Sequence, residues 1–136
     1  MTNEEFLKVR QQIVKEFIIT SDNVHMKMLE SPMLATRYSN LLVSEKRILD
    51  KLKIQLNILK KKLFIKYKGH NNYAISTKSD LETFIFADNE YNEIFTKIQE
   101  QELRTNFLKD SIEAFRKLSF TFNTYVEYKK LIEGGN

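Results

Sequence analysis

Residues that form turns are scarce in this chain, and their scarcity limits the folds it can adopt. The 136 residues include three Gly and one Pro, and two of the three Gly stand at the C-terminal end. Strand-rich folds need frequent tight turns, which depend on these residues. We therefore predict few, long elements and an all-α fold. A chain of this length builds one modest core, so we expect a single helical domain over 1–136.

Apolar residues recur at helical spacing along the chain. The pattern predicts N-terminal helices in 1–31, a long basic helix in 32–69, a loop in 70–78, an acidic helical region in 79–104 and a C-terminal helix in 105–136. Residues 120–128 are rich in β-favouring side chains, so a strand is the alternative there. Because the apolar spacing continues unbroken from Leu108, we favour a helix.

Two sequence signals indicate where helices begin. Ser31-Pro32 predicts the start of the long helix, because Ser caps free amides and Pro suits the first helical position. Ser79 with Glu82 three residues later forms a capping-box pattern for the next helix.

Leucines along the long helix repeat every seven residues, as in a coiled coil. The repeat comprises Leu42, Leu49, Leu56 and Leu63, with Leu52 and Leu59 at the interleaved positions and Glu45 and Lys66 as exceptions. A helix over 32–68 would run roughly 55 Å, whereas a compact domain of this size has a radius of gyration of about 14 Å. Part of the helix would project and need a partner, so we expect amphipathic helices with coiled-coil-like packing in a homo-oligomer.

Charge is distributed unevenly beneath a net charge of +4. Between Lys46 and Lys68 there are nine basic residues and one acid, whereas Asp80 to Glu113 contains nine acids and three bases. This asymmetry indicates a site for a polyanion, or charge-matched packing between the two halves, or both.

The basic helix predicts a binding site for single-stranded nucleic acid, because such sites combine cations with aromatic rings. Phe64 and Tyr73 are further candidates for stacking on bases, and His70 for contacting a phosphate. The alternative is that the lysines only keep a long helix solvated. The predicted nucleic-acid-binding residues are Lys53, Lys60, Lys61, Lys62, Lys66, Tyr67 and Lys68.

Motifs for catalysis and for metal binding are missing from the sequence. It has no Cys and no Gly-rich phosphate loop, and His25 and His70 lack the spacing of metal ligands. We therefore expect no enzyme, no metal and no cofactor. No apolar run reaches the ~18 residues of a membrane span, and no signal segment follows Met1, so we expect a cytoplasmic protein without a membrane partner.

With these residues identified, the chain resembles the UvsY family of T-even-like phages over residues 37–136. Leu59 to Gly69 (LKKKLFIKYKG) resembles the family segment Leu-Lys-Ala-Arg-Leu-Asp-Tyr-Tyr-Ser-Gly. Read from its start, the family's Lys and Arg fall on Lys60 and Lys62; read from its end, they fall on Lys61 and Leu63. The other matches are Tyr38-Ser39, Lys78-Ser79, Ala87-Asp88, Gln99, Glu113-Ala114 and the stretch from Phe120 to Glu133 and Gly135.

The resemblance implies a recombination mediator in the cytoplasm of an infected host cell. Such a protein binds single-stranded DNA as a ring of six or seven copies. It helps the phage recombinase to load onto DNA coated by the phage single-strand-binding protein, in homologous recombination, repair and recombination-dependent replication. The resemblance also assigns oligomerisation to the C-terminal helix, where the apolar row consists of Leu108, Ile112, Phe115, Phe122 and Val126.

Two other classes of function fit the same pattern. A structural coiled-coil adaptor would pair its basic stripe with its own acidic half and have no nucleic-acid role. A basic amphipathic helix could instead lie on anionic lipid.

Overall fold

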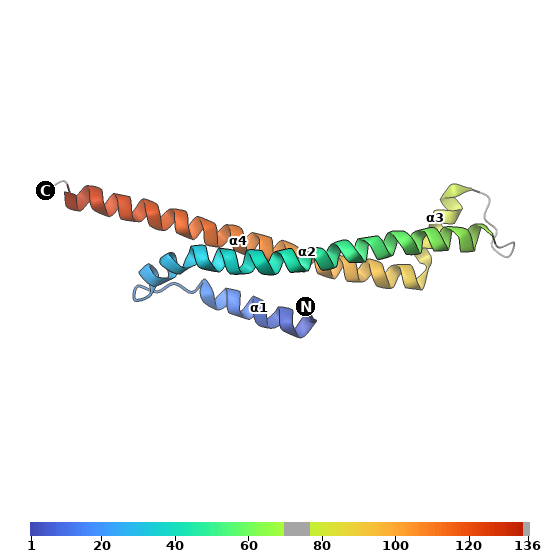
Figure 1. Ribbon diagram of the computed structural model, residues 1–136, viewed down its shortest axis with the longest axis horizontal. Coiled ribbons are helices and arrows are strands. Elements are labelled where there is room, and N and C mark those ends of the chain that lie inside the picture. Colours follow the sequence, from blue (N-terminus) through green and yellow to red (C-terminus); the bar gives the residue numbers. More distant parts are fainter. Residues whose placement is uncertain (70–76, 135–136) are drawn as a thin grey trace. The chain divides into compact units, whose positions relative to one another are not determined.

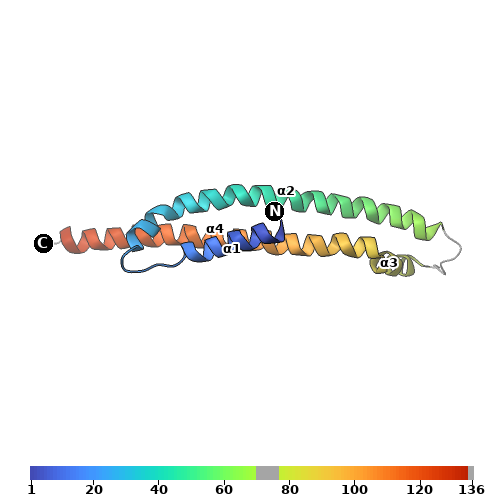
Figure 2. The same cartoon turned by 90° about the horizontal axis from the view of Figure 1, so that it is seen from below.

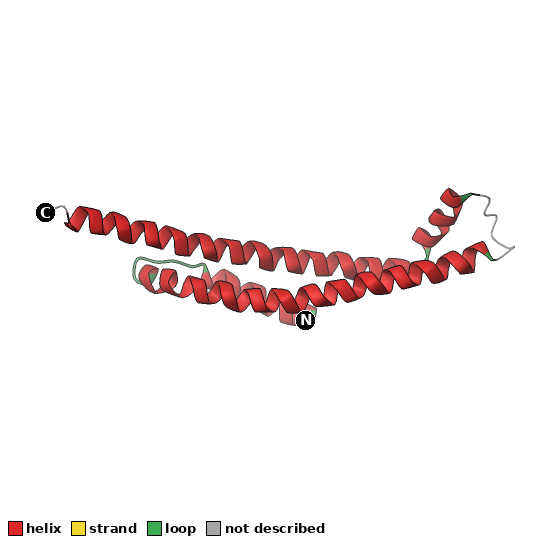
Figure 3. Cartoon of the chain, turned by 45° about the horizontal axis from the view of Figure 1, so that its top comes forward, coloured by secondary structure: helices red, strands yellow, loops and turns green. Residues whose placement is uncertain are grey.

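The computed structural model describes residues 1–69 and 77–134, apart from the side chains of Phe122 and Tyr125. All regular structure in these ranges is helical (Figures 1 and 3). The helices are α1 (Asn3–Glu16), α2 (Val24–Lys68), α3 (Lys78–Ala87) and α4 (Asn89–Gly134). This confirms the all-α fold and the helix at 120–128. None of the described helices combines the length and apolarity that a bilayer span requires.

The predicted start of the long helix at Ser31-Pro32 is wrong, because α2 begins at Val24 and contains Pro32. Proline has no N–H, so it cannot donate to the carbonyl of Met28 one turn earlier. The Ser31 hydroxyl donates to that carbonyl instead, at 2.7 Å. The helix therefore passes through Pro32 with this carbonyl still hydrogen-bonded.

Side chains cap the first turns of the other three helices. Thr2 forms a capping box at the start of α1. The hydroxyl of Thr77 accepts from the Asp80 amide at 3.1 Å, so α3 is capped by Thr77 and not by Ser79. Oδ1 of Asp88 accepts from the first amides of α4 at 3.0 and 3.2 Å.

The described chain forms two compact units, and residues of α2 and α4 contribute to both. Unit 1 comprises Met1–Ser44 and Arg104–Asn136. In it, α1 packs with the first part of α2 and the second part of α4 (Figures 1 and 2). The ring of Phe115 is fully buried between Phe17 and Tyr38, with centroids 4.3 and 5.7 Å away. The core residues are Ile13, Leu34, Ala35, Tyr38, Leu108, Ile112 and Phe115.

Unit 2 comprises Glu45–Leu103. Here α3 packs against the last turns of α2, and the first turns of α4 complete the cluster. Leu49 of the predicted leucine seam is also buried. The core residues are Leu59, Leu63, Tyr67, Leu81 and Ile85, with Phe84, Tyr91 and Ile94 packed against them.

A buried carboxylate occupies the polar exception in the leucine seam. Glu45 is 2% exposed. The Gln101 side-chain amide donates to its Oε2 at 2.6 Å and to its backbone carbonyl at 2.9 Å. A buried charge is costly without hydrogen bonds, so Gln101 explains how a glutamate is accommodated there.

The apolar row predicted to join subunits is mostly used inside the chain. Leu108, Ile112 and Phe115 are 0–3% exposed in the core of unit 1, so these three are not available to a second copy. Val126 is half-buried, and the side chain of Phe122 lies outside the described residues. Near the end of α4, other large apolar side chains are exposed instead, among them Phe120, Tyr128, Leu131 and Ile132.

Candidate nucleic-acid interface

The last turns of α2 carry the predicted lysines on their exposed surface. Leu59, Leu63 and Tyr67 form the buried stripe that orients this part of the helix in unit 2. Because successive residues are turned by about 100° around a helix, residues outside this stripe face solvent. All five ammonium-bearing side chains in this segment are exposed: Lys60, Lys61, Lys62, Lys66 and Lys68.

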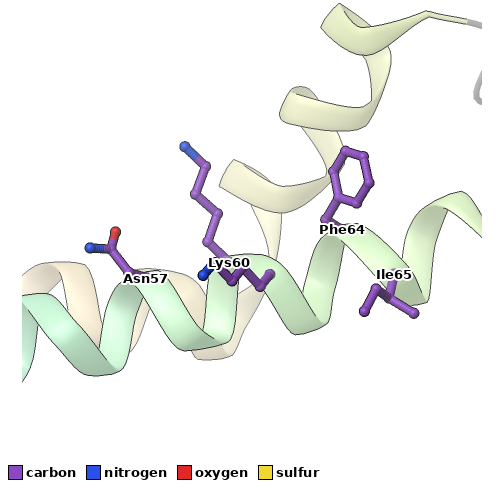
Figure 4. A pocket seen from close by; sticks show the side chains of 5 residues that line it. Asn57, Lys60, Phe64 and Ile65 are labelled. Carbon is purple, nitrogen blue, oxygen red and sulfur yellow. The ribbon is translucent and has the colours of Figure 1, made fainter.

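Four of these lysines are divided between two hollows on the surface of unit 2. Lys60 and Lys61 line a first hollow of about 560 Å³, together with Asn57, Phe64 and Ile65 (Figure 4). Figure 4 shows Lys60 and Phe64 extending from the same side of α2.

Two of the other lysines line a second hollow of about 640 Å³. Lys62 and Lys66 lie there with Glu90 and Ile94 of α4. Two steps of about 100° separate Lys60 from Lys62, so the charge spreads over both flanks of the buried stripe.

Charge pairing separates Lys53 from the other predicted lysines. Its ammonium lies 3.7 Å from Oε1 of Glu102, and both side chains are about half exposed. None of the five lysines from Lys60 to Lys68 forms an ion pair with a carboxylate of the described residues. Their positive charge is therefore not neutralised by an ion pair, although that of Lys66 also acts on the nearby Asp88.

Tyr67 is a core residue, which corrects its prediction as an aromatic contact to DNA. Its side chain is 8% exposed, its ring lies 5.7 Å from that of Phe84, and its hydroxyl donates to Oδ2 of Asp88 at 2.7 Å. The ring is thus not offered to a base. Tyr67 lies one turn after Leu63 in the buried stripe, so its helical spacing places it with the core and not with the lysines.

Hydrogen bonds keep the carboxylate of Asp88 ionised. Burial raises the pKa of Asp88, but donation by Tyr67 and by the amides of Tyr91 and Glu90, together with the charge of Lys66, outweighs it. The pKa of Asp88 therefore lies below its ordinary value of 3.8.

Two exposed rings lie beside lysine ammonium groups in unit 2. Phe64 is 40% exposed, with the Lys68 nitrogen 5.1 Å from its ring centroid. Phe86 of α3 is 48% exposed, with the Lys60 nitrogen 5.8 Å from its centroid. Sequence reasoning missed Phe86. Its position directly after core-facing Ile85 was the available signal, because that position turns away from the core.

The structure offers no comparable arrangement for metal chemistry. Among the described residues, no group of three or more His, Asp or Glu side chains is arranged to hold a metal ion. His70 and Tyr73, the other predicted contacts to nucleic acid, lie outside the described residues.

A helical protein with exposed lysines and exposed rings close together in one unit has features of proteins that hold single-stranded nucleic acid. The chain belongs to the UvsY family, described as recombination, repair and single-stranded-DNA-binding proteins, whose family model matches residues 12–135. No curated protein matches the sequence.

Crystal structures of the bacteriophage T4 recombination mediator protein UvsY share the fold. One lattice form gives a TM-score of 0.79 at 18% identity, covering 98% of each chain. Another gives 0.77 at 16% identity, covering 93% of this chain and 97% of the T4 chain. The TM-scores establish a common fold, whereas identity this low transfers no individual contact from the T4 protein to this chain.

Proposed function

We propose that this protein is a recombination mediator. It binds single-stranded DNA through the lysines of α2 and promotes loading of a phage recombinase onto DNA coated by single-strand-binding protein. Membership of the UvsY family supports the role in recombination and repair. The observation that carries the proposal is the set of five exposed lysines, from Lys60 to Lys68, that form no ion pair with a carboxylate of the described residues.

The strength of such a site follows from counterion release. If one copy contacts ~4 phosphates of a single strand, the log–log salt slope is about −3, and affinity falls roughly 50-fold between 50 and 200 mM salt. One copy alone is then a weak binder. A closed ring of six or seven copies, as the family resemblance implies, raises affinity through effective concentration. The proposed ring and the proposed DNA site therefore support one another.

Charge reversal tests the DNA site directly. We expect the triple variant Lys60→Glu, Lys61→Glu, Lys62→Glu to lose binding to an oligonucleotide at 50 mM salt and to retain its helicity by circular dichroism. Fluorescence anisotropy with single- and double-stranded DNA measures the effect. A matched control reverses the same charge in unit 1, at the exposed residues Lys109, Arg116 and Lys117. If the α2 variant and this control bind equally well, the site is rejected.

The proposed oligomer needs a different surface from the one first expected, because three members of the predicted row are buried. We assign it to the end of α4, where Phe120 is 74% and Leu131 77% exposed, with Val126 between them. Removing residues 120–136 leaves the core of unit 1 complete and should give a monomer by light scattering, with weaker DNA binding. An unchanged mass would place the subunit contact elsewhere.

One contact favours a second candidate, the structural adaptor. The Lys53–Glu102 pair joins the basic and acidic regions within unit 2. If pairing of this kind were the purpose of the basic residues, the protein would not retain DNA even at low salt. A gel shift at 50 mM salt separates the two functions.

A further inference from the structure

The first hollow has more apolar surface than phosphate binding requires. Phe64 and Ile65 line it beside Lys60 and Lys61, and Ile65 is 72% exposed (Figure 4). Lysines alone are sufficient to hold phosphates, and they hold the phosphates of single and double strands alike. Phosphate binding therefore does not account for the exposed apolar side chains beside these lysines.

The two exposed rings repeat one arrangement. Phe64 has the Lys68 ammonium 5.1 Å from its centroid, and Phe86 has the Lys60 ammonium 5.8 Å from its centroid. Lys60 also lines the hollow that contains Phe64, so it connects the two rings. Each ring is partly exposed and has an ammonium over it, and the Phe86 ring also lies 5.5 Å from that of Tyr91.

Unpaired nucleotides have the matching chemistry. A base has a flat π-face that stacks on an aromatic ring, and the phosphate on its sugar carries the negative charge. Bases in a duplex are already stacked and cannot reach such rings. The volume of the first hollow, about 560 Å³, lies within the range of small-ligand sites.

We propose that Phe64 and Phe86 are base-stacking residues, and that Lys68 and Lys60 hold the adjoining phosphates. The proposal rests on the proposed function and adds the origin of its specificity. Preference for single over double strands comes from these rings, whereas overall affinity comes from the lysines.

A second copy of the chain covering the same rings is the rival interpretation. It would remove Lys60 and Lys68 from water together with the rings, and neither has a carboxylate partner among the described residues. Burying unpaired charges is costly, whereas a nucleic-acid strand brings a phosphate for each. The charges therefore favour DNA as the occupant.

The test removes the aromatic ring from the protein and, separately, the bases from the DNA strand. Phe64→Leu and Phe86→Leu keep an apolar side chain but remove the aromatic face. Each is titrated with an oligothymidylate and with an abasic strand of equal length, which keeps every phosphate. We expect each variant to bind the thymidine strand at least about 5-fold more weakly than the parent protein. Binding to the abasic strand and the salt slope should be unchanged.

The control is Phe95→Leu, a ring of unit 2 that is 40% exposed and lies beside Tyr91 instead of a lysine. It should bind both strands like the parent protein. If Phe64→Leu and Phe86→Leu both bind thymidine strands as tightly as the parent protein does, the inference is overturned. A change in their oligomeric mass by light scattering would also overturn it, because the rings would then belong to a subunit contact.

Failure of the inference is distinguishable from failure of the proposed function. If the parent protein binds both strands equally and the triple lysine variant binds neither, only the stacking role is lost. If the parent protein binds neither strand, both proposals fail.

Discussion

The two units use the same tyrosine–carboxylate contact in different surroundings. In unit 1, the Tyr38 hydroxyl donates to Glu16 at 2.7 Å inside the core. In unit 2, the Tyr67 hydroxyl donates to Asp88 at the same distance, but Asp88 is half-buried and also caps α4. Burial, then the hydrogen bond and charge of Glu16, raise the pKa of Tyr38, so its hydroxyl remains a donor.

The cores themselves differ in how they use aromatic rings. Unit 1 stacks Phe17, Phe115 and Tyr38 in its interior. Unit 2 buries mainly Leu and Ile and leaves Phe64 and Phe86 exposed beside lysines. Rings thus stabilise the fold of unit 1, whereas the exposed rings of unit 2 are those proposed to contact DNA.

The largest expected effect is on the stacked rings of unit 1. Phe115→Ala should lower the free energy of unfolding by about 3–5 kcal/mol, because it opens a cavity between two rings. Urea denaturation measures the change. Met33→Ala, at an exposed side chain of unit 1, should stay within about 0.5 kcal/mol of the parent protein. A loss below about 1 kcal/mol for Phe115→Ala would contradict the aromatic core.

A smaller, pH-dependent effect is expected at the contact in unit 2. Tyr67→Phe removes a donor from a partly exposed carboxylate, so we expect a loss of about 1–2 kcal/mol at neutral pH. The folded-state pKa of Asp88 lies below the ordinary 3.8. Its ionised form therefore stabilises the fold above that pH, and this contribution disappears as the pH falls through the lowered value.

Urea denaturation between pH 7 and pH 2 tests this expectation. The stability difference between the parent protein and Tyr67→Phe should shrink in acid. Tyr128→Phe, at a ring 60% exposed, is the control. A difference that is constant down to pH 2 would separate the tyrosine from the ionisation of Asp88.

The smallest effect is expected at the exposed ion pair. Lys53→Gln should change the free energy of unfolding by less than about 0.5 kcal/mol, since both partners are half exposed and screened by solvent. The Lys53→Gln variant should also lose less DNA affinity, relative to the parent protein, than the Lys60→Gln variant does. A larger loss of stability would favour the structural adaptor, because charge pairing would then hold unit 2 together.

The sequence was sufficient for the helical fold and for the location of the charge. Because Gly and Pro are scarce, a helix has few places at which to end, and the leucine repeat identified Leu59 and Leu63 as core residues. The start of α2 was missed because Pro32 resembles a helix start. Only the structure reveals that the Ser31 hydroxyl reaches back to Met28 and keeps the helix continuous.

The contacts of individual side chains were harder to predict. A periodic apolar row shows that a face is covered, but not whether its own chain or another copy covers it. Leu108, Ile112 and Phe115 turned out to be covered by their own chain. Likewise, the repeat located the lysines on α2 but not their division between two flanks, which depends on where α3 packs.

Tyr67 fixes the rotational position of the lysine-bearing helix. It lies in the core cluster and is hydrogen-bonded to Asp88, which caps α4. One uncharged residue inserted between Lys62 and Tyr67 would turn every lysine before it by about 100° relative to this fixed point, while leaving the number of lysines and the net charge unaltered. The number of residues between the lysines and Tyr67 is thus as much a part of the binding surface as the lysines themselves.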